Sequence, residues 1–261
     1  MAASLASGSR RSLIRFSALV DPAHSGHRQR CIHSCRDGHQ CRRQPSEHLV
    51  NLEPLTPENT TIVLVDHAVG FANVLRSHDT AEHINNVAGL AKTALWYGSG
   101  LVATNGRPDK PSGPLYPQLK ETIGDHPVVE RGGNFNGFLD ADFARAVRET
   151  GRRKLAIAGV STEGCVLQTV LGALRENYEV YLVVDATASL TAETHAVAVE
   201  RMVQAGASPV TWFSLAGEFT VDHRSATAPH FQRLMREHVP TMAMGVQSYL
   251  SALQQTGPRP A

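Results

Sequence analysis

Cys165 is the residue whose surroundings most favour chemistry. It follows an apolar run at residues 155–158 and a short turn at residues 159–164, and a helical pattern begins around it. Ser161 and Thr162 are suitable caps for that helix. The thiol would lie in the first helical turn, where unpaired N–H groups and the helix dipole favour an anion, so we expect a lowered thiol pKa and a stronger nucleophile. The alternative is a cysteine that only fills the core, as free cysteines often do.

The elements that would position this thiol alternate regularly from Asn59 onward. Helical patterns alternate with short predicted strands, and several of these strands are apolar on both faces. This favours an α/β fold with a parallel sheet covered by helices on both sides. In the helix at residues 82–97, the predicted inner face includes Leu90 and Leu95, and Asp140 is expected to cap the next helix. The predicted strands are residues 61–65, 101–104, 127–129, 155–158, 179–184 and 210–213, and the predicted helices are residues 82–97, 141–150, 164–177, 194–205 and 231–237.

Two further side chains are predicted to converge on Cys165. In an open parallel sheet, ligands bind beyond the carboxyl ends of the strands where the strand order reverses. Asp66 ends the first strand region and Arg131 the third, and a 3-2-1-4-5 order would place the first strand beside the one that leads to Cys165. Taken alone, Asp66 is an ordinary turn residue and Arg131 an ordinary surface cation. Together with the thiol they form an acid, a cation and a nucleophile at one crevice.

The composition restricts the class of protein. The 261 residues are 42% hydrophobic and 19% charged with a net charge of +1, which is typical of a globular protein with one large domain or two small ones. This balance gives no electrostatic case for binding nucleic acid or an anionic membrane, and no run approaches the roughly 20 apolar residues that span a bilayer. The 4 cysteines do not form a disulfide framework, so we expect a reducing compartment and a cytoplasmic location.

Residues 1–50 differ from the rest and are predicted to be a disordered or targeting-like extension before a domain at residues 55–250 and a polar tail at residues 251–261. Residues 1–20 are rich in Arg and Ser and resemble an organellar transit peptide, although an upstream start codon would give the same pattern. A metal-binding or nucleic-acid-binding role of this arm stays an alternative, because cysteines and histidines alternate there, but their spacing matches no strong zinc pattern. These residues are His27, Cys31, His33, Cys35, His39 and Cys41.

Several segments together carry a resemblance to a known family. Residues 65–67 (Val-Asp-His), 131–138, 159–166 and 184–189 resemble the isochorismatase-like cysteine hydrolase superfamily, and the chain is most similar to its YcaC-related branch. The resemblance covers roughly residues 55–250 and is specific because the motifs occur in order at appropriate intervals. It implies a Rossmann-like three-layer αβα sandwich with a parallel sheet of five to six strands, and a large homo-oligomer.

The resemblance also implies an Asp–Lys–Cys triad, with Asp66 as acid and base and Cys165 as nucleophile. The family's cis peptide falls at Val160–Ser161, and the amides of Ser161 and Cys165 take the oxyanion-hole positions. Arg131 stands where most members have Lys, and it cannot release a proton near neutral pH. Asp66 must therefore accept the thiol proton and later activate water, while Arg131 holds both partners by its charge.

The resemblance also bears on which residues could bind a metal ion and which could line the pocket. Nicotinamidase-type relatives carry an Asp/His cluster for a divalent ion after the second strand, where this chain has Asp109 and no His. His67 and His126 become ligands only if the fold brings them together, so we expect no metal and no cofactor. The pocket is expected to be lined by His67, Asn134, Phe135, Phe138 and Thr162.

The presence of Cys165 favours hydrolysis of an amide, carbamoyl or nitrile-like bond in a small molecule over cleavage of the vinyl ether isochorismate. One alternative is a catalytically inactive or redox-sensing homologue that acts as an oligomeric binding protein, with Phe135 or Phe138 filling the pocket. The C-terminal helical region and residues 212–215 are candidate contacts between subunits.

Overall fold

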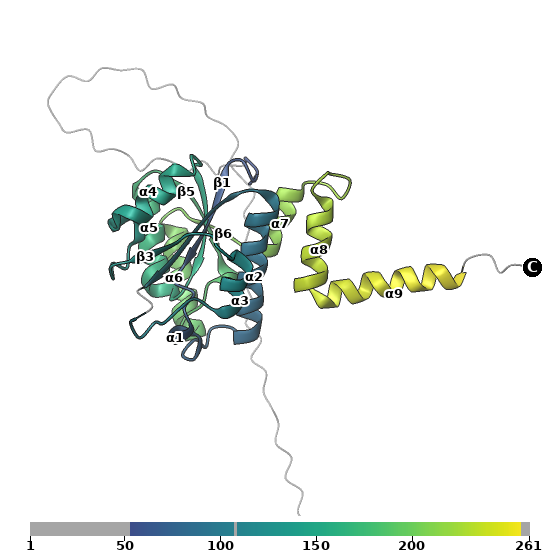
Figure 1. Ribbon diagram of the computed structural model, residues 1–261, viewed down its shortest axis with the longest axis horizontal. Coiled ribbons are helices and arrows are strands. Elements are labelled where there is room, and N and C mark those ends of the chain that lie inside the picture. Colours follow the sequence, from purple (N-terminus) through teal and green to yellow (C-terminus); the bar gives the residue numbers. More distant parts are fainter. Residues whose placement is uncertain (1–52, 107–108, 257–261) are drawn as a thin grey trace, which may run out of the picture. The chain divides into compact units, whose positions relative to one another are not determined.

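The computed structural model describes residues 53–106 and 109–256 (Figure 1). The predictions for residues 1–50, including the transit-peptide pattern and the Cys31, Cys35 and Cys41 cluster, lie outside the described residues. Among the described residues, no helix combines the length and the apolar character needed to cross a membrane.

A six-stranded sheet in the order β3-β2-β1-β4-β5-β6 forms the middle layer, and all its neighbouring strands are parallel. This confirms the predicted α/β class and the order in which β1 lies between β2 and β4. All residues of β1 and β4 are buried, as expected for central strands covered on both faces. The strands are β1 Thr60–Val65, β2 Gly100–Gly106, β3 Val128–Arg131, β4 Lys154–Gly159, β5 Glu179–Val183 and β6 Ser208–Val210.

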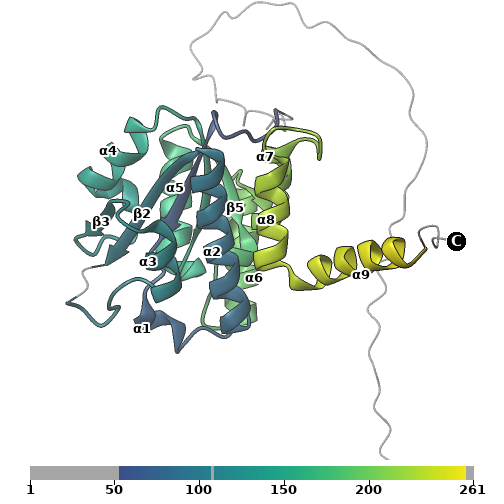
Figure 2. The same ribbon diagram turned by 45° about the vertical axis from the view of Figure 1, so that its right-hand side comes forward.

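Helices cover both faces of this sheet (Figures 1 and 2). Ile62 and Leu64 point to the face covered by α2, α3, α7 and α8, whereas Val63 and Val65 point to the face covered by α4, α5 and α6. The helices are α1 Val69–Ala72, α2 Thr80–Tyr97, α3 Pro117–Ile123, α4 Ala141–Glu149, α5 Leu167–Arg175, α6 Ala192–Gln204, α7 Trp212–Thr220, α8 Ala228–His238 and α9 Pro240–Thr256, with short turns η1 Gly137–Leu139, η2 Thr162–Val166 and η3 Val184–Ala186.

Side-chain caps fix where several helices begin. Asp140 accepts hydrogen bonds from the amides of Asp142 and Phe143, both at 3.1 Å, which confirms the predicted cap of α4. Asp79 accepts from the amide of Glu82 at 2.9 Å and starts α2 two residues before the predicted helix. These caps satisfy amides that the helix itself leaves unpaired.

Two sequence predictions are wrong in detail. The predicted strand at residues 210–213 ends at Val210, because Thr211 caps α7: its side chain accepts from the amide of Ser214 at 3.2 Å, and the Ser214 hydroxyl accepts from the amide of Thr211 at 3.0 Å. Leu95 is 40% exposed, although Leu90 is fully buried, because it lies about 140° around the helix from Leu90.

The C-terminal region is more helical than the sequence predicted. The single predicted helix at residues 231–237 is the centre of α8, and a second helix, α9, follows it from Pro240 to Thr256. Residues 251–256 of the predicted polar tail are therefore helical. Figures 1 and 2 show α9 leaving the body at its junction with α8.

Candidate active site

Asp66, Arg131 and Cys165 lie together at the carboxyl edge of the sheet. Asp66 follows β1, Arg131 is the last residue of β3, and Cys165 lies in η2 directly after β4. All three line one pocket of about 140 Å³, together with Phe71, Gly106, Ser112, Gly133, Asn134 and Phe135. The strand order produces this convergence, because β1 pairs with both β2 and β4 and brings their ends to one point.

The carboxylate of Asp66 is held on both oxygens. Arg131 Nη2 donates to Oδ2, and the hydroxyl of Thr104 donates to Oδ1 at 2.9 Å. Arg131 also donates from Nε to Thr104 Oγ1 at 3.2 Å and from Nη1 to the carbonyl oxygen of Asn134. Both charged side chains are almost fully buried. The arginine therefore orients the acid and is itself fixed by β2 and the following loop.

The pKa of the Cys165 thiol is raised, whereas the sequence predicted that it would be lowered. Its pKa is raised to about 11: burial is the largest cause, the charge and hydrogen bonding of the nearby Asp66 carboxylate add to the rise, and Arg131 opposes it. The expected lowering by a helix N-terminus does not dominate, because the π turn η2 separates the strand from α5, which begins only at Leu167. The resting side chain is consequently a neutral thiol beside a carboxylate base.

The turn between β4 and Cys165 is fixed by a close backbone contact with β1 and by hydrogen bonds within the turn. A Cβ on Gly159 would lie 2.4 Å from the carbonyl oxygen of Val65, so only glycine permits β1 and β4 to approach this closely. The peptide bond between Val160 and Ser161 is cis. The carbonyl of Ser161 accepts from the amides of Gly164 and Val166 at 3.1 and 3.2 Å, which closes the turn that presents Cys165.

Only some of the predicted pocket residues line this cavity. Asn134 and Phe135 do, and Phe135 is 66% exposed at its rim. Phe138 instead packs into the core, with its ring centroid 5.2 Å from that of Phe143. Phe71 and Ser112 also line the pocket, and no sequence pattern marked them, because they come from α1 and from the long loop after β2.

His67 and Thr162, both fully buried, belong to a layer of polar side chains that is separate from the residues lining the pocket. Thr162 shares a hydrogen bond of 2.9 Å with His195 Nδ1. Ring contacts link His67 to His83 at 5.7 Å between centroids, His83 to His78 at 6.4 Å and His78 to His195 at 4.8 Å. Burial is the main cause of lowered pKa values, about 4 for His67, about 2 for His83 and about 4 for His195, so these rings are neutral at pH 7.

This histidine layer has unmatched polar atoms. Among the described residues, His67 Nδ1, both ring nitrogens of His83 and the hydroxyl of Tyr116 are buried without a hydrogen-bond partner. The described residues contain no group of three or more His, Cys, Asp or Glu side chains placed to hold a metal ion. His67 and His126, the two candidate ligands, bind different carbonyl oxygens, those of Ala186 and Leu101.

Comparison with known proteins identifies the family. The protein-family model of the isochorismatase domain matches residues 60–214. The chain belongs to the isochorismatase family. It is 34% identical over 201 residues to the probable hydrolase YcaC of Escherichia coli, covering 77% of this chain and 96% of that protein. The protein is thus an isochorismatase-family hydrolase, as the sequence motifs predicted.

Solved structures of YcaC proteins support the same assignment for this isochorismatase-family chain. The Pseudomonas aeruginosa YcaC structure, with hexane-2,5-diol and covalent acrylamide, has a TM-score of 0.73 and 34% identity over 76% of this chain and 98% of that one. The Escherichia coli YcaC structure, described as an octameric hydrolase of unknown specificity, also has a TM-score of 0.73, with 35% identity over 76% and 97% of the two chains.

Proposed function

We propose that this isochorismatase-family hydrolase cleaves an amide, carbamoyl or related C–N bond of a small, uncharged molecule through a covalent intermediate on Cys165. The observation that carries this proposal is the grouping of a thiol, a carboxylate and a guanidinium around one small pocket. The carboxylate lies close enough to the thiol to raise the thiol pKa by hydrogen bonding. A neutral nucleophile beside its own base suits attack on a carbonyl carbon.

The reaction uses Asp66 as the carrier of one proton. Asp66 takes the thiol proton as Cys165 sulfur attacks the carbonyl carbon, and the oxyanion that forms faces the amides of Ser161 and Cys165. The protonated Asp66 then gives that proton to the leaving nitrogen, the C–N bond breaks and a thioester remains. Water attacks the thioester with Asp66 again as base, which releases the acid and restores the thiol.

Arg131 stabilises this arrangement and restricts the charge of the substrate. Its guanidinium cannot donate a proton near neutral pH, so it acts by orienting Asp66 and by opposing the rise in the Cys165 pKa. Its charge is matched by Asp66, and its other hydrogen bonds go to Thr104 and Asn134. Among the described residues that line the pocket, no cation is left for a substrate carboxylate, which disfavours a dicarboxylate such as isochorismate.

The pocket dimensions support a small substrate. Its volume of about 140 Å³ is below the roughly 300–1,000 Å³ common for ligand pockets. The similar YcaC structure from Pseudomonas aeruginosa holds an amide, acrylamide, covalently, and an uncharged diol. Both are small and uncharged, which supports a neutral substrate for a pocket whose described cation, Arg131, is already paired with Asp66. Because the similar Escherichia coli protein is described as octameric, we also propose that this chain forms a homo-oligomer.

The alternative of an inactive or redox-sensing homologue has less support. Phe135 is mostly exposed and Phe138 packs in the core, so neither ring fills the pocket. Oxidation of a cysteine by peroxides proceeds through its thiolate, and a pKa raised to about 11 leaves little thiolate at neutral pH.

A substrate screen tests the proposed function directly. The full chain is incubated with small uncharged amides and carbamoyl compounds, ammonia release is measured, and the Cys165 peptide is examined by mass spectrometry. We expect ammonia release with an acyl group on Cys165 during turnover, and neither with Cys165→Ala. Matched carboxylate-bearing analogues should react at least 10-fold more slowly. Turnover that survives in Cys165→Ala would contradict the covalent mechanism.

A further inference from the structure

The backbone of Asp66 has an unusual conformation for a residue with a side chain. Its φ angle is 55°, which lies in the left-handed region. This region is unfavourable for residues other than glycine, although Asp and Asn tolerate it better than most. A residue keeps such a conformation in a folded protein only where the surrounding contacts hold it there. The contacts that hold Asp66 therefore help to build the site.

The left-handed conformation reverses the alternation of side chains at the end of β1. In a regular strand, successive side chains point to opposite faces of the sheet. Leu64 points to the face covered by α2, and Val65 points to the face covered by α5. An unbroken alternation would place Asp66 on the α2 face and His67 on the α5 face. The structure shows the reverse placement for both residues.

Asp66 reaches the α5 face. Its carboxylate accepts hydrogen bonds from the side chains of Thr104 and Arg131. These two residues come two positions after Val102 in β2 and Val129 in β3, and both valines pack on the α5 face. Since side chains two positions apart in a strand share a face, Thr104 and Arg131 lie on the same side. The reversal therefore turns the proposed base toward its partners.

His67 is fixed on the α2 face by its backbone and by its side chain. It is the central residue of a tight turn, in which the amide of Ala68 donates to the carbonyl oxygen of Asp66 at 2.6 Å. The carbonyl oxygen of His67 accepts from the amide of Tyr116 at 2.8 Å. Its ring nitrogen Nε2 lies 3.0 Å from the carbonyl oxygen of Ala186. Because a carbonyl oxygen can only accept, Nε2 carries the proton and donates it.

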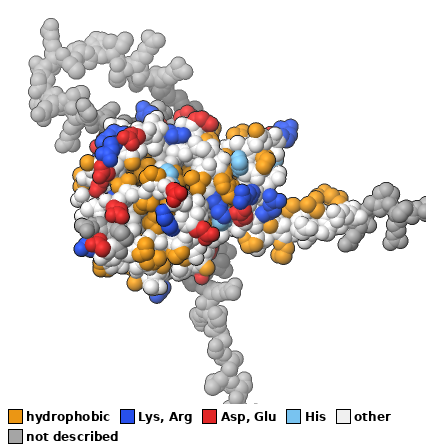
Figure 3. Space-filling model, viewed as in Figure 1, with side chains coloured by type: hydrophobic (Ala, Val, Ile, Leu, Met, Phe, Trp, Pro, Cys, Tyr) orange, Lys and Arg blue, Asp and Glu red, His pale blue; other side chains and the backbone are white. Residues whose placement is uncertain are grey.

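This ring hydrogen bond is sheltered from solvent. Figure 3 shows histidine at only a few small places on the face that it draws, and His67 itself has no exposed surface. The pKa of His67 is lowered to about 4, chiefly by burial, so the ring is neutral at pH 7. Water at the surface cannot replace this donor. Loss of the donor would leave a carbonyl oxygen without its partner, which is costly inside a protein.

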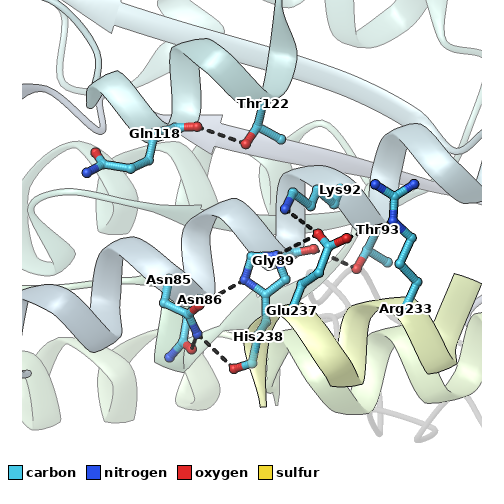
Figure 4. A network of polar contacts seen from close by, with 10 residues as sticks. All are labelled: Asn85, Asn86, Gly89, Lys92, Thr93, Gln118, Thr122, Arg233, Glu237 and His238. Atoms are coloured by element: carbon cyan, nitrogen blue, oxygen red, sulfur yellow. Dashed lines mark hydrogen bonds and ion pairs between the residues drawn. The ribbon is translucent and has the colours of Figure 1, made fainter. Parts of the chain in front are cut away.

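The acceptor of this hydrogen bond is also held in place. Ala186 belongs to η3, and Asn86 of α2 donates from Nδ2 to the carbonyl oxygen of the preceding residue, Asp185, at 3.0 Å. Figure 4 shows Asn86 on α2. The Asp185 carboxylate accepts from the amide of Trp212 at 2.9 Å, and the indole of Trp212 donates to Asn86 Oδ1 at 3.0 Å. The ring is therefore anchored to a segment that α2 and α7 fix.

We propose that His67 is a positioning residue for hydrolysis at Cys165: its hydrogen bond to Ala186 keeps Asp66 in the left-handed conformation that turns the carboxylate toward the thiol. His67 does not line the pocket, so it acts through Asp66 and not on the substrate. This role rests on the proposed function of Asp66 as the base. The placement of the carboxylate beside the thiol can nevertheless be measured without turnover.

The Cys165 thiol reports where the Asp66 carboxylate lies. Asp66 raises the thiol pKa by its charge and by hydrogen bonding. If the carboxylate moves away, the thiol pKa falls and the fraction of thiolate at a given pH rises. A loss of stability alone would not change this pKa in the molecules that remain folded. The thiol pKa therefore distinguishes a positioning role from a merely structural one.

Three substitutions in the full chain separate these roles. His67→Phe keeps a ring and removes the donor, whereas His67→Gln keeps an N–H donor. His83→Phe is the matched control, because the His83 ring lies 5.7 Å from the His67 ring and forms no hydrogen bond among the described residues. Each variant is examined for the rate of Cys165 alkylation against pH, for kcat and KM with a small uncharged amide, and for folding by circular dichroism.

We expect His67→Phe to shift the alkylation profile to lower pH and to raise the alkylation rate at pH 8 about 10-fold. Its kcat should fall about 10- to 100-fold with little change in KM, because the base is misplaced while the pocket is kept. His67→Gln should recover most of both properties, and His83→Phe should change neither. His67→Leu takes the place of the Phe variant if that variant does not fold.

The alkylation profile decides the proposal. A folded His67→Phe or His67→Leu variant with the normal profile would overturn the positioning role, whatever its kcat. A shift of the same size in His83→Phe would also overturn it, because the effect would then belong to the whole histidine layer. If the normal chain hydrolyses no amide, the proposed function fails, but a shifted profile in His67→Phe alone still supports the positioning of Asp66 by His67.

Discussion

At the scale of single residues, Asp66 and Arg131 act on the Cys165 thiol in opposite directions. Asp66 raises the thiol pKa and Arg131 lowers it. We therefore expect Asp66→Asn to lower the pKa below about 11 and Arg131→Gln to raise it. The rate of alkylation against pH, mapped by peptide mass spectrometry, measures both shifts, and Cys31, Cys35 and Cys41 in the same sample serve as reference thiols.

The variants of Asp66 and Arg131 also distinguish an effect on the thiol pKa from an effect on the rate of hydrolysis. Asp66→Asn should lower the thiol pKa and so make the thiolate easier to form. It also removes the proton acceptor, so the rate of hydrolysis should fall about 10²–10⁴-fold. Each variant leaves one buried charge unpaired, and circular dichroism must first show that it folds. If both substitutions moved the thiol pKa in the same direction, or if Asp66→Asn hydrolysed amides at the normal rate, the roles assigned to these residues would be wrong.

At the scale of elements, the close approach of β1 and β4 sets the geometry of the site. Gly159→Ala would place a methyl group 2.4 Å from the Val65 carbonyl oxygen, so we expect a loss of about 1–3 kcal/mol of stability and a larger relative loss of activity. Urea denaturation and amide hydrolysis measure the two effects. In the matched control Gly217→Ala, at a half-buried helical position, the nearest atom outside the helix's own backbone is 4.0 Å away, so this change should stabilise the protein slightly.

The elements also show what the sequence could predict. The strands were predictable because they are short apolar runs between helical patterns, and the strand order predicted that Asp66, Arg131 and Cys165 converge, whereas their roles came from the resemblance to the family. The start of α7 was missed because the apolar pair Trp212–Phe213 suggests a strand. In the structure, a capping box between Thr211 and Ser214 stabilises the first turn of a helix there. The lowered thiol pKa was wrong because burial and the Asp66 charge depend on packing, which local sequence does not contain.

At the scale of the whole molecule, four histidines far apart in the sequence meet in one layer, in which two are fully buried and two are partly exposed. His67, His78, His83 and His195 come from the end of β1, the loop before α2, α2 and α6, and no spacing rule connects them. They lie beside both Asp66 and the turn that carries Cys165. Protonation of this layer would therefore affect the fold and the site together.

The pH dependence of stability follows from these histidines. Their pKa values are lowered on folding from about 6.5, to about 4 for His67 and His195 and about 2 for His83, so the unfolded chain binds more protons below pH 6.5. The contribution of these neutral histidines to the free energy of unfolding is complete above that pH. It is lost as the pH falls toward 4, by about 1 kcal/mol per pH unit for each of the fully buried His67 and His83. Asp185, whose pKa burial raises to about 6, opposes this loss, but it is one group against several.

Urea midpoints measured between pH 7.5 and 4.5 test this linkage. We expect the midpoint of the normal chain to fall steadily below pH 6.5, and His83→Phe to fall less, because this substitution removes the ring whose pKa is lowered most and which has no hydrogen bond to lose among the described residues. His223→Gln, at an exposed histidine, should follow the normal chain. If His83→Phe retained the full pH dependence, acid sensitivity would have to arise from groups outside the histidine layer.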